Sequence, residues 1–304
     1  MTKRYFLHTF GCQMNEYDSA RIAETLERLG YEPTDEPKRA DFILLNSCSI
    51  REKAEQKMLS ALGRYAIYHR NRPDMKLVLA GCTAQLRGEE ILQKVPELDL
   101  VMGTDVVSQL KSWLSGGGPR TKLLERVPSR DYQFCQATPR REHTGVSVNV
   151  TIMKGCDNRC AYCVVPAARG PRIDRERGAL LNEVDRMVEA GAREVVLIGQ
   201  NVNAYERETG GFATLLREVA ARPGVQRVRF TTSHPRDLDL DTVRSVAETQ
   251  EVCPHFHLPV QSGSTRVLRS MGRGYTREDY LEKVGWIRSQ CPDGAISTDI
   301  IVGF

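Results

Sequence analysis

The chain of 304 residues contains no apolar run that approaches the roughly 20 residues needed to cross a bilayer. Its first ten residues alternate in polarity, and they lack the charged segment and apolar stretch of a signal peptide. Neither sign of charge dominates, since 43 Lys and Arg stand against 39 Asp and Glu. These absences argue against a membrane or secreted protein, and we expect a cytoplasmic chain with no membrane partner.

The nine cysteines are odd in number and are not densely spaced, so the sequence also lacks the pattern of a disulfide framework. Structural disulfides are rare where thiols are kept reduced. We therefore expect these cysteines to be ligands, nucleophiles or small buried residues. Cys135, Cys253 and Cys291 each stand alone, and we expect them to be free thiols.

Strand-like apolar segments alternate with helical spacing along both halves of the chain, which predicts parallel sheets with crossover helices. In the first half we expect strands at 4–10, 42–45, 76–80 and 98–102, with helices at 16–29, 51–68 and 87–94. In the second half we expect strands at 148–153, 194–198, 227–231, 256–258 and 295–302, with helices at 177–190, 212–221, 238–247 and 280–289.

A glycine-rich run, residues 115–119, interrupts this pattern and begins a polar stretch. We predict a first domain at 1–115, a connector at 116–145 and a second domain at 146–304. The chain stops directly after a predicted strand, at Phe304. We therefore expect that the full-length protein continues and that residues 1–304 alone are inactive.

Three cysteines follow the first strand of the second domain, at Cys156, Cys160 and Cys163. Thiolates are the usual ligands of a 4Fe–4S cluster, which takes four. Three ligands leave one iron open for a small chelating molecule. The alternatives are a zinc site, which usually needs a second cysteine pair, and three buried cysteines without a ligand.

Three further cysteines, Cys12, Cys48 and Cys82, each follow a predicted strand of the first domain. The carboxyl ends of parallel strands meet at one edge of a sheet, where such sheets bind ligands. Helix N-termini at that edge favour thiolates. This spacing predicts a second three-thiolate cluster site, and three unrelated buried cysteines are the alternative.

The C-x3-C-x2-C spacing, with Tyr162 before its last cysteine, resembles the radical S-adenosylmethionine superfamily. The resemblance implies a partial (βα) barrel, a 4Fe–4S cluster and S-adenosylmethionine cleaved to a 5′-deoxyadenosyl radical. Polar residues after barrel strands are the ones we expect to hold this cofactor: Gln200, Asn201, Ser233, Gln261 and Ser262.

Further motifs resemble the methylthiotransferases, and the segment SIREKAEQK at 49–57 resembles the branch named MiaB. The matching segments are TFGCQMN (9–15), NSCSIREKAEQK (46–57), GCTAQ (81–85), IMKGCDN (152–158), CVVP (163–166), GQNVNAY (199–205), FTTSHP (230–235), HLPVQSGS (257–264) and STDIIVGF (297–304). Departures from the family pattern are Ser47 and the loop AARG at 167–170. The family's final barrel strands and small C-terminal RNA-binding domain are not in this sequence.

The resemblance implies an α/β protein with an N-terminal parallel-sheet domain and a partial radical SAM barrel that is incomplete at its C-terminus. It implies two 4Fe–4S clusters, one bearing sulfur and one making the radical. The expected reaction adds a methylthio group to carbon 2 of N6-isopentenyl adenosine beside a tRNA anticodon. It also implies a reducing partner such as flavodoxin or ferredoxin, and we expect a monomer.

Several alternatives stay open from the sequence. Related enzymes act on threonylcarbamoyl adenosine in tRNA or on an aspartate of a ribosomal protein, and a binding protein can use clusters structurally. His234, His255 and His257 are either catalytic or structural. A basic stretch surrounds the second triad, with eight Lys and Arg against four Asp and Glu between residues 140 and 177. Its candidate phosphate contacts are Arg140, Arg141, Arg159, Arg169 and Arg172.

Overall fold

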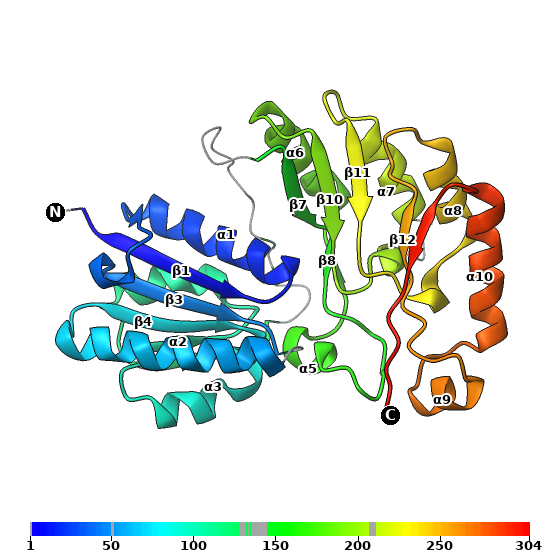
Figure 1. Cartoon of the computed structure of the whole chain (residues 1–304). Helices are drawn as coiled ribbons and strands as arrows, with labels where there is room; N and C mark the ends of the chain where they lie inside the picture. The colour runs from blue at the N-terminus through cyan, green and yellow to red at the C-terminus, as the bar shows by residue number, and fades with distance from the viewer. Residues whose placement is uncertain (1, 50–51, 128–131, 133, 135–144, 207–210) are drawn as a thin grey trace. The chain divides into compact units, whose positions relative to one another are not determined.

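The structure is a computed structural model that describes all residues except 1, 50–51, 128–131, 133, 135–144 and 207–210 (Figure 1). Cys135, Arg140 and Arg141 therefore lie outside the described residues. The chain forms two compact units. The first comprises Met1–Ala137 together with Ala167–Gly170, and the second comprises Thr138–Pro166 with Pro171–Phe304.

The first unit is built on a parallel sheet with strand order β2-β1-β3-β4-β5-β6. Its strands are β1 (Arg4–Phe10), β2 (Glu32–Pro33), β3 (Phe42–Ser47), β4 (Lys76–Gly81), β5 (Leu100–Met102) and β6 (Thr121–Leu123). Its helices are α1 (Gln13–Arg28), α2 (Glu52–Asn71), α3 (Cys82–Lys94) and α4 (Leu110–Ser115). The parallel sheet expected from the sequence is present, and β6 adds an edge strand within the stretch predicted as connector.

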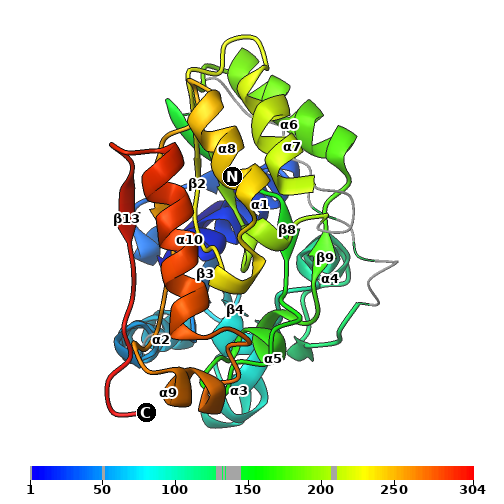
Figure 2. The ribbon, with the colours of Figure 1, turned by 90° about the vertical axis from the view of Figure 1, so that its right-hand side faces the viewer.

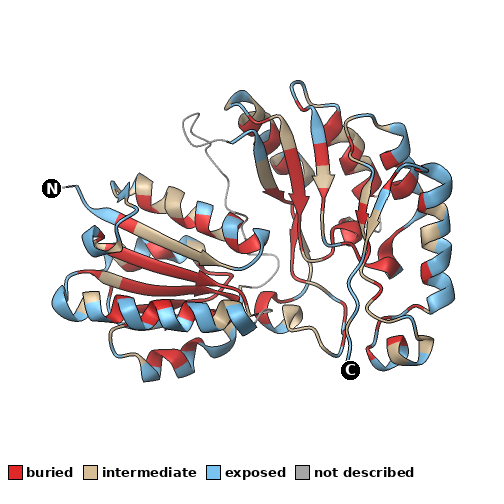
Figure 3. Ribbon diagram, viewed as in Figure 1, coloured by how far each residue is buried: buried red, intermediate tan, exposed pale blue. Residues whose placement is uncertain are grey.

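Helices cover both faces of this sheet because alternate strand residues point to opposite sides. Ile43 and Leu45 pack under α2 and α3, whereas Phe42 and Leu44 pack under α1 and α4. The strands β3, β4 and β5 are buried along most of their length, β1 is mostly half-buried, and the outer helix faces are exposed (Figure 3). Burial on both faces explains why β3 and β4 read as continuous apolar runs.

The strand order reverses between β1 and β3. From β1 the chain crosses through α1 to the edge strand β2, and from β3 it crosses through α2 to β4 on the other side. Crossovers that leave in opposite directions open a crevice outside the carboxyl ends of these two strands, which is the usual ligand site of such sheets. Cys12 and Cys48 directly follow these two strand ends.

The second unit has the parallel strands of a partial barrel. Its strands β11, β10 and β7 pair in that order, and β12 pairs with β13. A bridge from Val228 to Val252 joins β11 to the segment that enters β12. The strands are β7 (Ser147–Thr151), β10 (Glu194–Ile198), β11 (Arg227–Phe230), β12 (His255–His257) and β13 (Ala295–Ser297), with a small antiparallel pair β8 (Met153–Lys154) and β9 (Ile173–Asp174).

Neighbouring helices α6, α7, α8 and α10 pack against one another along the second unit (Figure 2). The helices are α5 (Val165–Arg169), α6 (Arg177–Glu189), α7 (Gly211–Ala220), α8 (Leu240–Glu248), α9 (Thr265–Ser270) and α10 (Arg277–Gln290). The end of α5 belongs to the first unit, through Ala167–Gly170. The last strand is shorter than predicted, since β13 ends at Ser297 and only a bridge at Ile300 follows. The α/β fold with a partial barrel is confirmed.

Within the described ranges, no helix combines the length and apolarity required to cross a bilayer.

Candidate functional site

The first cysteine triad lies at the carboxyl edge of the sheet of the first unit. Cys12 is the N-cap of α1, Cys48 follows β3, and Cys82 is the first residue of α3. The backbone N–H of Cys48 donates to the carbonyl of Phe10 over 2.8 Å, which ties the first two cysteine loops together. Parallel strand ends therefore bring together three residues that are widely separated in sequence.

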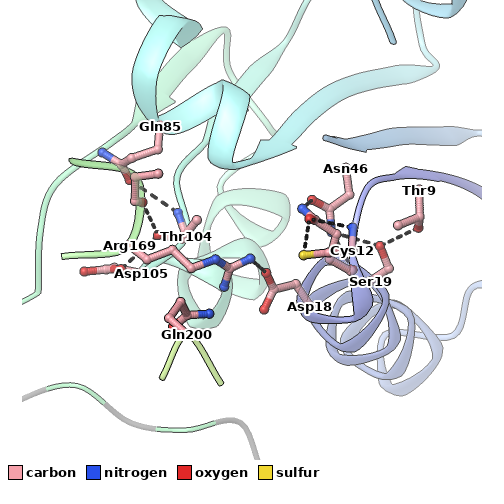
Figure 4. Close-up of polar contacts among 12 residues, drawn as sticks. Thr9, Cys12, Asp18, Ser19, Asn46, Gln85, Thr104, Asp105, Arg169 and Gln200 are labelled. Atoms are coloured by element: carbon pink, nitrogen blue, oxygen red, sulfur yellow. Dashed lines mark hydrogen bonds and ion pairs between the residues drawn. The ribbon is translucent and has the colours of Figure 1, made fainter. Parts of the chain in front are cut away.

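A buried polar network holds these loops in place. Asn46 Nδ2 donates to the backbone oxygen of Asn15 over 2.8 Å and to Ser19 Oγ over 2.9 Å, and Ser19 Oγ meets Thr9 Oγ1 at 2.7 Å (Figure 4). Asn15 Nδ2 returns a bond to Asn46 Oδ1 over 3.0 Å. Because buried amides must be satisfied, this network specifies one register between β1, α1 and β3.

Two glycines leave room for this network. Gly11 and Gly81 have positive φ angles of 153° and 92°. A Cβ at Gly11 would lie 2.6 Å from the Cβ of Cys48, and one at Gly81 would lie 2.2 Å from Asn46 Oδ1. Neither position accepts a side chain without displacing a cysteine loop.

The three thiols differ in their electrostatics. A hydrogen bond from Cys48, the helix-terminal amides of Asn15 and Met14, and the charge of Arg169 outweigh burial and lower the pKa of Cys12 to about 6. Burial raises the pKa of Cys82, although Arg169 opposes it. The Cys48 hydrogen bond is thus the main cause at Cys12, with the helix-terminal amides adding to it, whereas desolvation dominates at Cys82.

Arg169 belongs to this thiol site. The sequence predicts it as a phosphate contact, but the structure buries it to 5% exposure in the first unit. Its Nη2 donates to Asp18 Oδ2 over 2.7 Å (Figure 4). Thr104 Oγ1 anchors the preceding residue by donating to the carbonyl of Ala168 over 3.0 Å. The phosphate prediction for Arg169 is therefore wrong, because an already paired and buried guanidinium is not presented to solvent.

The second triad lies in the loop between β8 and α5. Gly155 begins this loop with a φ of 74°, and its N–H donates to Gln200 Oε1 over 2.5 Å. Within the loop, the N–H of Cys163 donates to the carbonyl of Cys160 over 3.0 Å. Burial raises the pKa of both Cys156 and Cys163. Metal binding at this loop must therefore displace protons from half-buried thiols.

The residues present fit iron–sulfur clusters. In the first unit the Cys12 and Cys48 side chains are hydrogen-bonded, and Cys82 interacts electrostatically with Cys12. In the second unit Cys156 interacts in the same way with Cys160 and Cys163. Across the described residues, no three His, Cys, Asp or Glu side chains are arranged around a single ion. A cubane binds each thiolate through a different iron and so suits more widely spaced sulfurs.

The predicted cofactor residues divide into two groups. Asn201 and Ser233 are buried at 3% and 6% exposure, and Asn201 Oδ1 and Ser233 Oγ have no hydrogen-bond partner among the described residues. Asn158 Oδ1, in the cysteine loop, is a third such atom. Buried polar atoms without partners are costly, so these three indicate a polar ligand.

The other three candidates already have structural partners. Gln200 accepts from Gly155, as described above. Ser262 Oγ accepts the N–H of Ser264 over 3.2 Å, a turn contact. Gln261 exchanges backbone hydrogen bonds with Asp299 and Ile301 and has a φ of 68°, as does Thr232 after β11. Strained backbone at these two strand ends is typical of a functional edge.

The three candidate histidines have structural contacts. The side chains of His255 and His257 each meet Ser297 Oγ at 3.0 Å. Burial and the nearby charge of Arg273 lower the pKa of His234 to about 3. His234 Nδ1 accepts the N–H of Arg236 over 3.2 Å, so Nε2 carries the proton of the neutral ring. That nitrogen lies 4.0 Å from Cys160 Sγ.

Sequence reasoning missed several residues that the structure places at these sites. They are Asp18 beside Arg169, Asn158 in the cysteine loop, Asp237 bound by Asn201 over 2.6 Å, and Arg273 at Cys160. The sequence could have indicated Arg273, because it lies between Gly272 and Gly274, whose φ angles are 68° and 71°. For Asp18, the sequence feature that could have indicated a role is its position on α1, one helical turn after Asn15.

A basic hollow of about 670 Å³ lies on the first unit, beside the first cysteine loops. His8 and Phe10 form its floor with ring centroids 4.0 Å apart. The exposed cations Lys53, Lys57 and Arg64 project from α2 around it, together with Gln56 and Ser60. No ion pair involving these three cations is found among the described residues.

Two family models match the chain. Residues 4–103 match the uncharacterized protein family UPF0004, and residues 150–304 match the radical SAM superfamily. Among curated relatives, the tRNA-2-methylthio-N(6)-dimethylallyladenosine synthase of Myxococcus xanthus is 48% identical over 99% of this chain and 66% of its own length. The protein of the same name from Sulfurihydrogenibium sp. is 44% identical, over 99% and 70%. The chain thus spans about two thirds of these relatives.

Solved structures share the fold at low identity. The cobalamin-dependent S-adenosylmethionine radical enzyme OxsB matches with a TM-score of 0.65 at 13% identity, covering 99% of this chain and 49% of that one. The radical S-adenosylmethionine methyltransferase TsrM from Kitasatospora setae matches at 0.65 and 14%, covering 99% and 69%. Together with the placement of both triads at strand ends, the sequence matches show that the chain belongs to the radical SAM superfamily and, within it, to the family of the tRNA-2-methylthio-N(6)-dimethylallyladenosine synthases.

Proposed function

We propose that this chain adds a methylthio group to carbon 2 of N6-isopentenyl adenosine beside the anticodon of tRNA. The observation that carries the proposal is the pair of cysteine triads in a chain 44–48% identical to relatives named for this product. One triad lies at the carboxyl edge of the parallel strands β1, β3 and β4, and the other lies in the loop after β8. The carbon–hydrogen bond at adenine carbon 2 is not acidic, so proton transfer to a base cannot open it. Radical chemistry meets that requirement.

Each triad would hold one 4Fe–4S cluster with one iron free of protein ligands. The cluster at Cys156, Cys160 and Cys163 would supply the electron that cleaves S-adenosylmethionine. The cluster at Cys12, Cys48 and Cys82 would supply the sulfur that is inserted into the base. The protein contributes positioning. Asn158, Asn201 and Ser233 offer buried polar atoms to the methionine or ribose end of S-adenosylmethionine. A low-potential electron donor such as flavodoxin or ferredoxin is the partner this chemistry needs.

The basic hollow supports an RNA partner. Exposed Lys53, Lys57 and Arg64 offer positive charge without competing carboxylates among the lining residues, and the rings of His8 and Phe10 offer an aromatic floor. Phosphates and bases of RNA are recognised by such combinations. Exposed Arg159 and half-buried Arg172 remain further candidates, although Arg172 already donates to the carbonyl of Ala204 over 2.7 Å.

Iron analysis tests the two-cluster part of the proposal. Anaerobically reconstituted protein is expected to bind about eight irons, and Cys48→Ala and Cys160→Ala about four each. About four irons in the wild-type chain, lost entirely in one variant and unchanged in the other, would leave a single cluster. Release of 5′-deoxyadenosine from S-adenosylmethionine by the reduced protein separates an enzyme from a protein that uses clusters structurally.

Mass spectrometry of tRNA tests the substrate. Cells lacking the gene are expected to accumulate N6-isopentenyl adenosine and to lose its 2-methylthio form. Persistence of the methylthio form would reject the substrate. Loss of the methylthio form of threonylcarbamoyl adenosine in its place would assign the chain to the related activity.

A further inference from the structure

A buried arginine contacts the sulfur of Cys160. Arg273 is 4% exposed and lies in the turn that follows α9. Its Nη1 donates to Cys160 Sγ over 3.3 Å, its Nε to the hydroxyl of Tyr275 over 3.1 Å, and its Nη2 to the carbonyl of Pro259 over 3.0 Å. The guanidinium is thus held on three sides by a sulfur, a phenol and a backbone carbonyl.

The charge of Arg273 lacks a carboxylate partner. Among the described residues no Asp or Glu forms an ion pair with it, although arginines elsewhere in this unit pair with acids, as Arg175 does with Glu183. A buried charge is strongly unfavourable unless a counter-charge compensates it. Of its three contacts, the Cys160 sulfur is the one that would become anionic when a cluster binds, because a cysteine ligates iron as the thiolate.

The turn that carries Arg273 is fitted to the cysteine loop. The N–H of Ala161 donates to the carbonyl of Met271 over 2.9 Å. Gly272 has a φ of 68°, and a Cβ there would lie 2.9 Å from the carbonyl oxygen of Arg159. His234 Nε2 faces the same Cys160 sulfur at 4.0 Å. The sulfur therefore sits among hydrogen-bond donors on a close-packed backbone.

We propose that Arg273 is a positioning residue for the cluster at Cys156, Cys160 and Cys163, where it orients the Cys160 sulfur and raises the reduction potential of the cluster. A positive charge and a hydrogen bond at a ligand sulfur stabilise the reduced cluster, which is the more negative state. Arg273 thereby makes the cluster easier to reduce by its electron donor. The inference rests on the proposed cluster at this triad.

The test is a redox titration of the cluster followed by electron paramagnetic resonance. The full chain is used with Cys12, Cys48 and Cys82 all replaced by Ala, so that one cluster contributes the signal. In this background Arg273→Gln is expected to shift the midpoint potential to more negative values, and Arg273→Lys to shift it in the same direction by a smaller amount. Arg217→Gln is the matched control, because the Arg217 side chain is 39% exposed and pairs with Asp241 over 2.8 Å. It is expected to leave the potential unchanged.

Each outcome decides one claim. Absence of iron from the background that retains Arg273 would contradict the cluster, not the arginine. Normal iron content with the same potential in Arg273→Gln as in the parent would overturn the role of Arg273. If Arg273→Gln fails to bind iron, the lysine variant provides the test of the role of Arg273. An iron-loaded Arg273→Lys with the parent's potential and an altered affinity for S-adenosylmethionine would assign Arg273 to that ligand and overturn the proposal.

Discussion

Asn15 donates a hydrogen bond through Nδ2 to Asn46 Oδ1 over 3.0 Å, although the two residues lie 31 positions apart. Asn15 is three residues past Cys12, and Asn46 is two residues before Cys48. The pair therefore fixes the distance between two thiols that belong to different βα units. Because both amides are fully buried, the pairing has no water to replace it.

Gly81 tests how tightly this network is packed. Gly81→Ala is expected to destabilise the protein by about 2–4 kcal/mol, because the new Cβ would meet Asn46 Oδ1 at 2.2 Å on a backbone with φ of 92°. Guanidinium denaturation of the apo protein followed by circular dichroism measures the change. Gly63→Ala is the control, since Gly63 lies in α2 and a Cβ added there would have no heavy atom within 4 Å. It is expected to stabilise by about 0.5–1 kcal/mol.

Cys12 is expected to be the most reactive thiol of the first triad in the apo protein. Cys12 is an exposed residue whose thiol pKa is lowered to about 6, so its alkylation by iodoacetamide should rise through pH 6 and level off near pH 7. Cys82 is buried with a raised pKa and should react slowly. Arg169→Gln removes a nearby positive charge and should move the Cys12 profile to higher pH. Peptide mass spectrometry measures the extent of alkylation at each cysteine. An unchanged pH profile in this variant would show that Arg169 does not lower the pKa of Cys12.

Ser233 is expected to contact S-adenosylmethionine. Ser233→Ala should weaken binding by about 1 kcal/mol, or roughly fivefold, since its unpartnered Oγ would lose the ligand bond. Anaerobic calorimetry with the reconstituted protein measures this. Ser245→Ala is the matched control, because Ser245 is also buried but its Oγ donates to the carbonyl of Thr242 over 2.9 Å. Equal affinities for both variants would remove Ser233 from the site.

The basic hollow is expected to contact tRNA phosphates. Simultaneous replacement of Lys53, Lys57 and Arg64 by Gln should weaken tRNA binding and reduce the slope of log affinity against log salt by about two. Filter binding at several salt concentrations measures both quantities. The control replaces three cations outside the hollow, Lys3, Lys38 and Lys111, of which the first two precede strands at the opposite sheet edge. An equal loss in the control would indicate a general charge effect.

Much of the fold could be read from local pattern. The βα alternation, the apolar strands and the stopping glycines at Gly30 and Gly191 depend on neighbours in sequence, and the structure has these elements close to the predicted bounds. The strand β6, within the predicted connector, could not be predicted, because it is a three-residue edge strand whose pairing with β5 depends on tertiary contact. Short edge strands carry little periodicity of their own.

The sequence by itself predicted which residues would bind iron. The loop spacing of three cysteines and the position of three others after successive parallel strands depend only on chain order and topology. Only the tertiary structure decided what surrounds them. Arg169 meets Asp18 across 151 residues, and Arg273 meets Cys160 across 113. No spacing rule links such pairs, because their contacts depend on how loops that are distant in sequence pack together and exclude water from the buried charge.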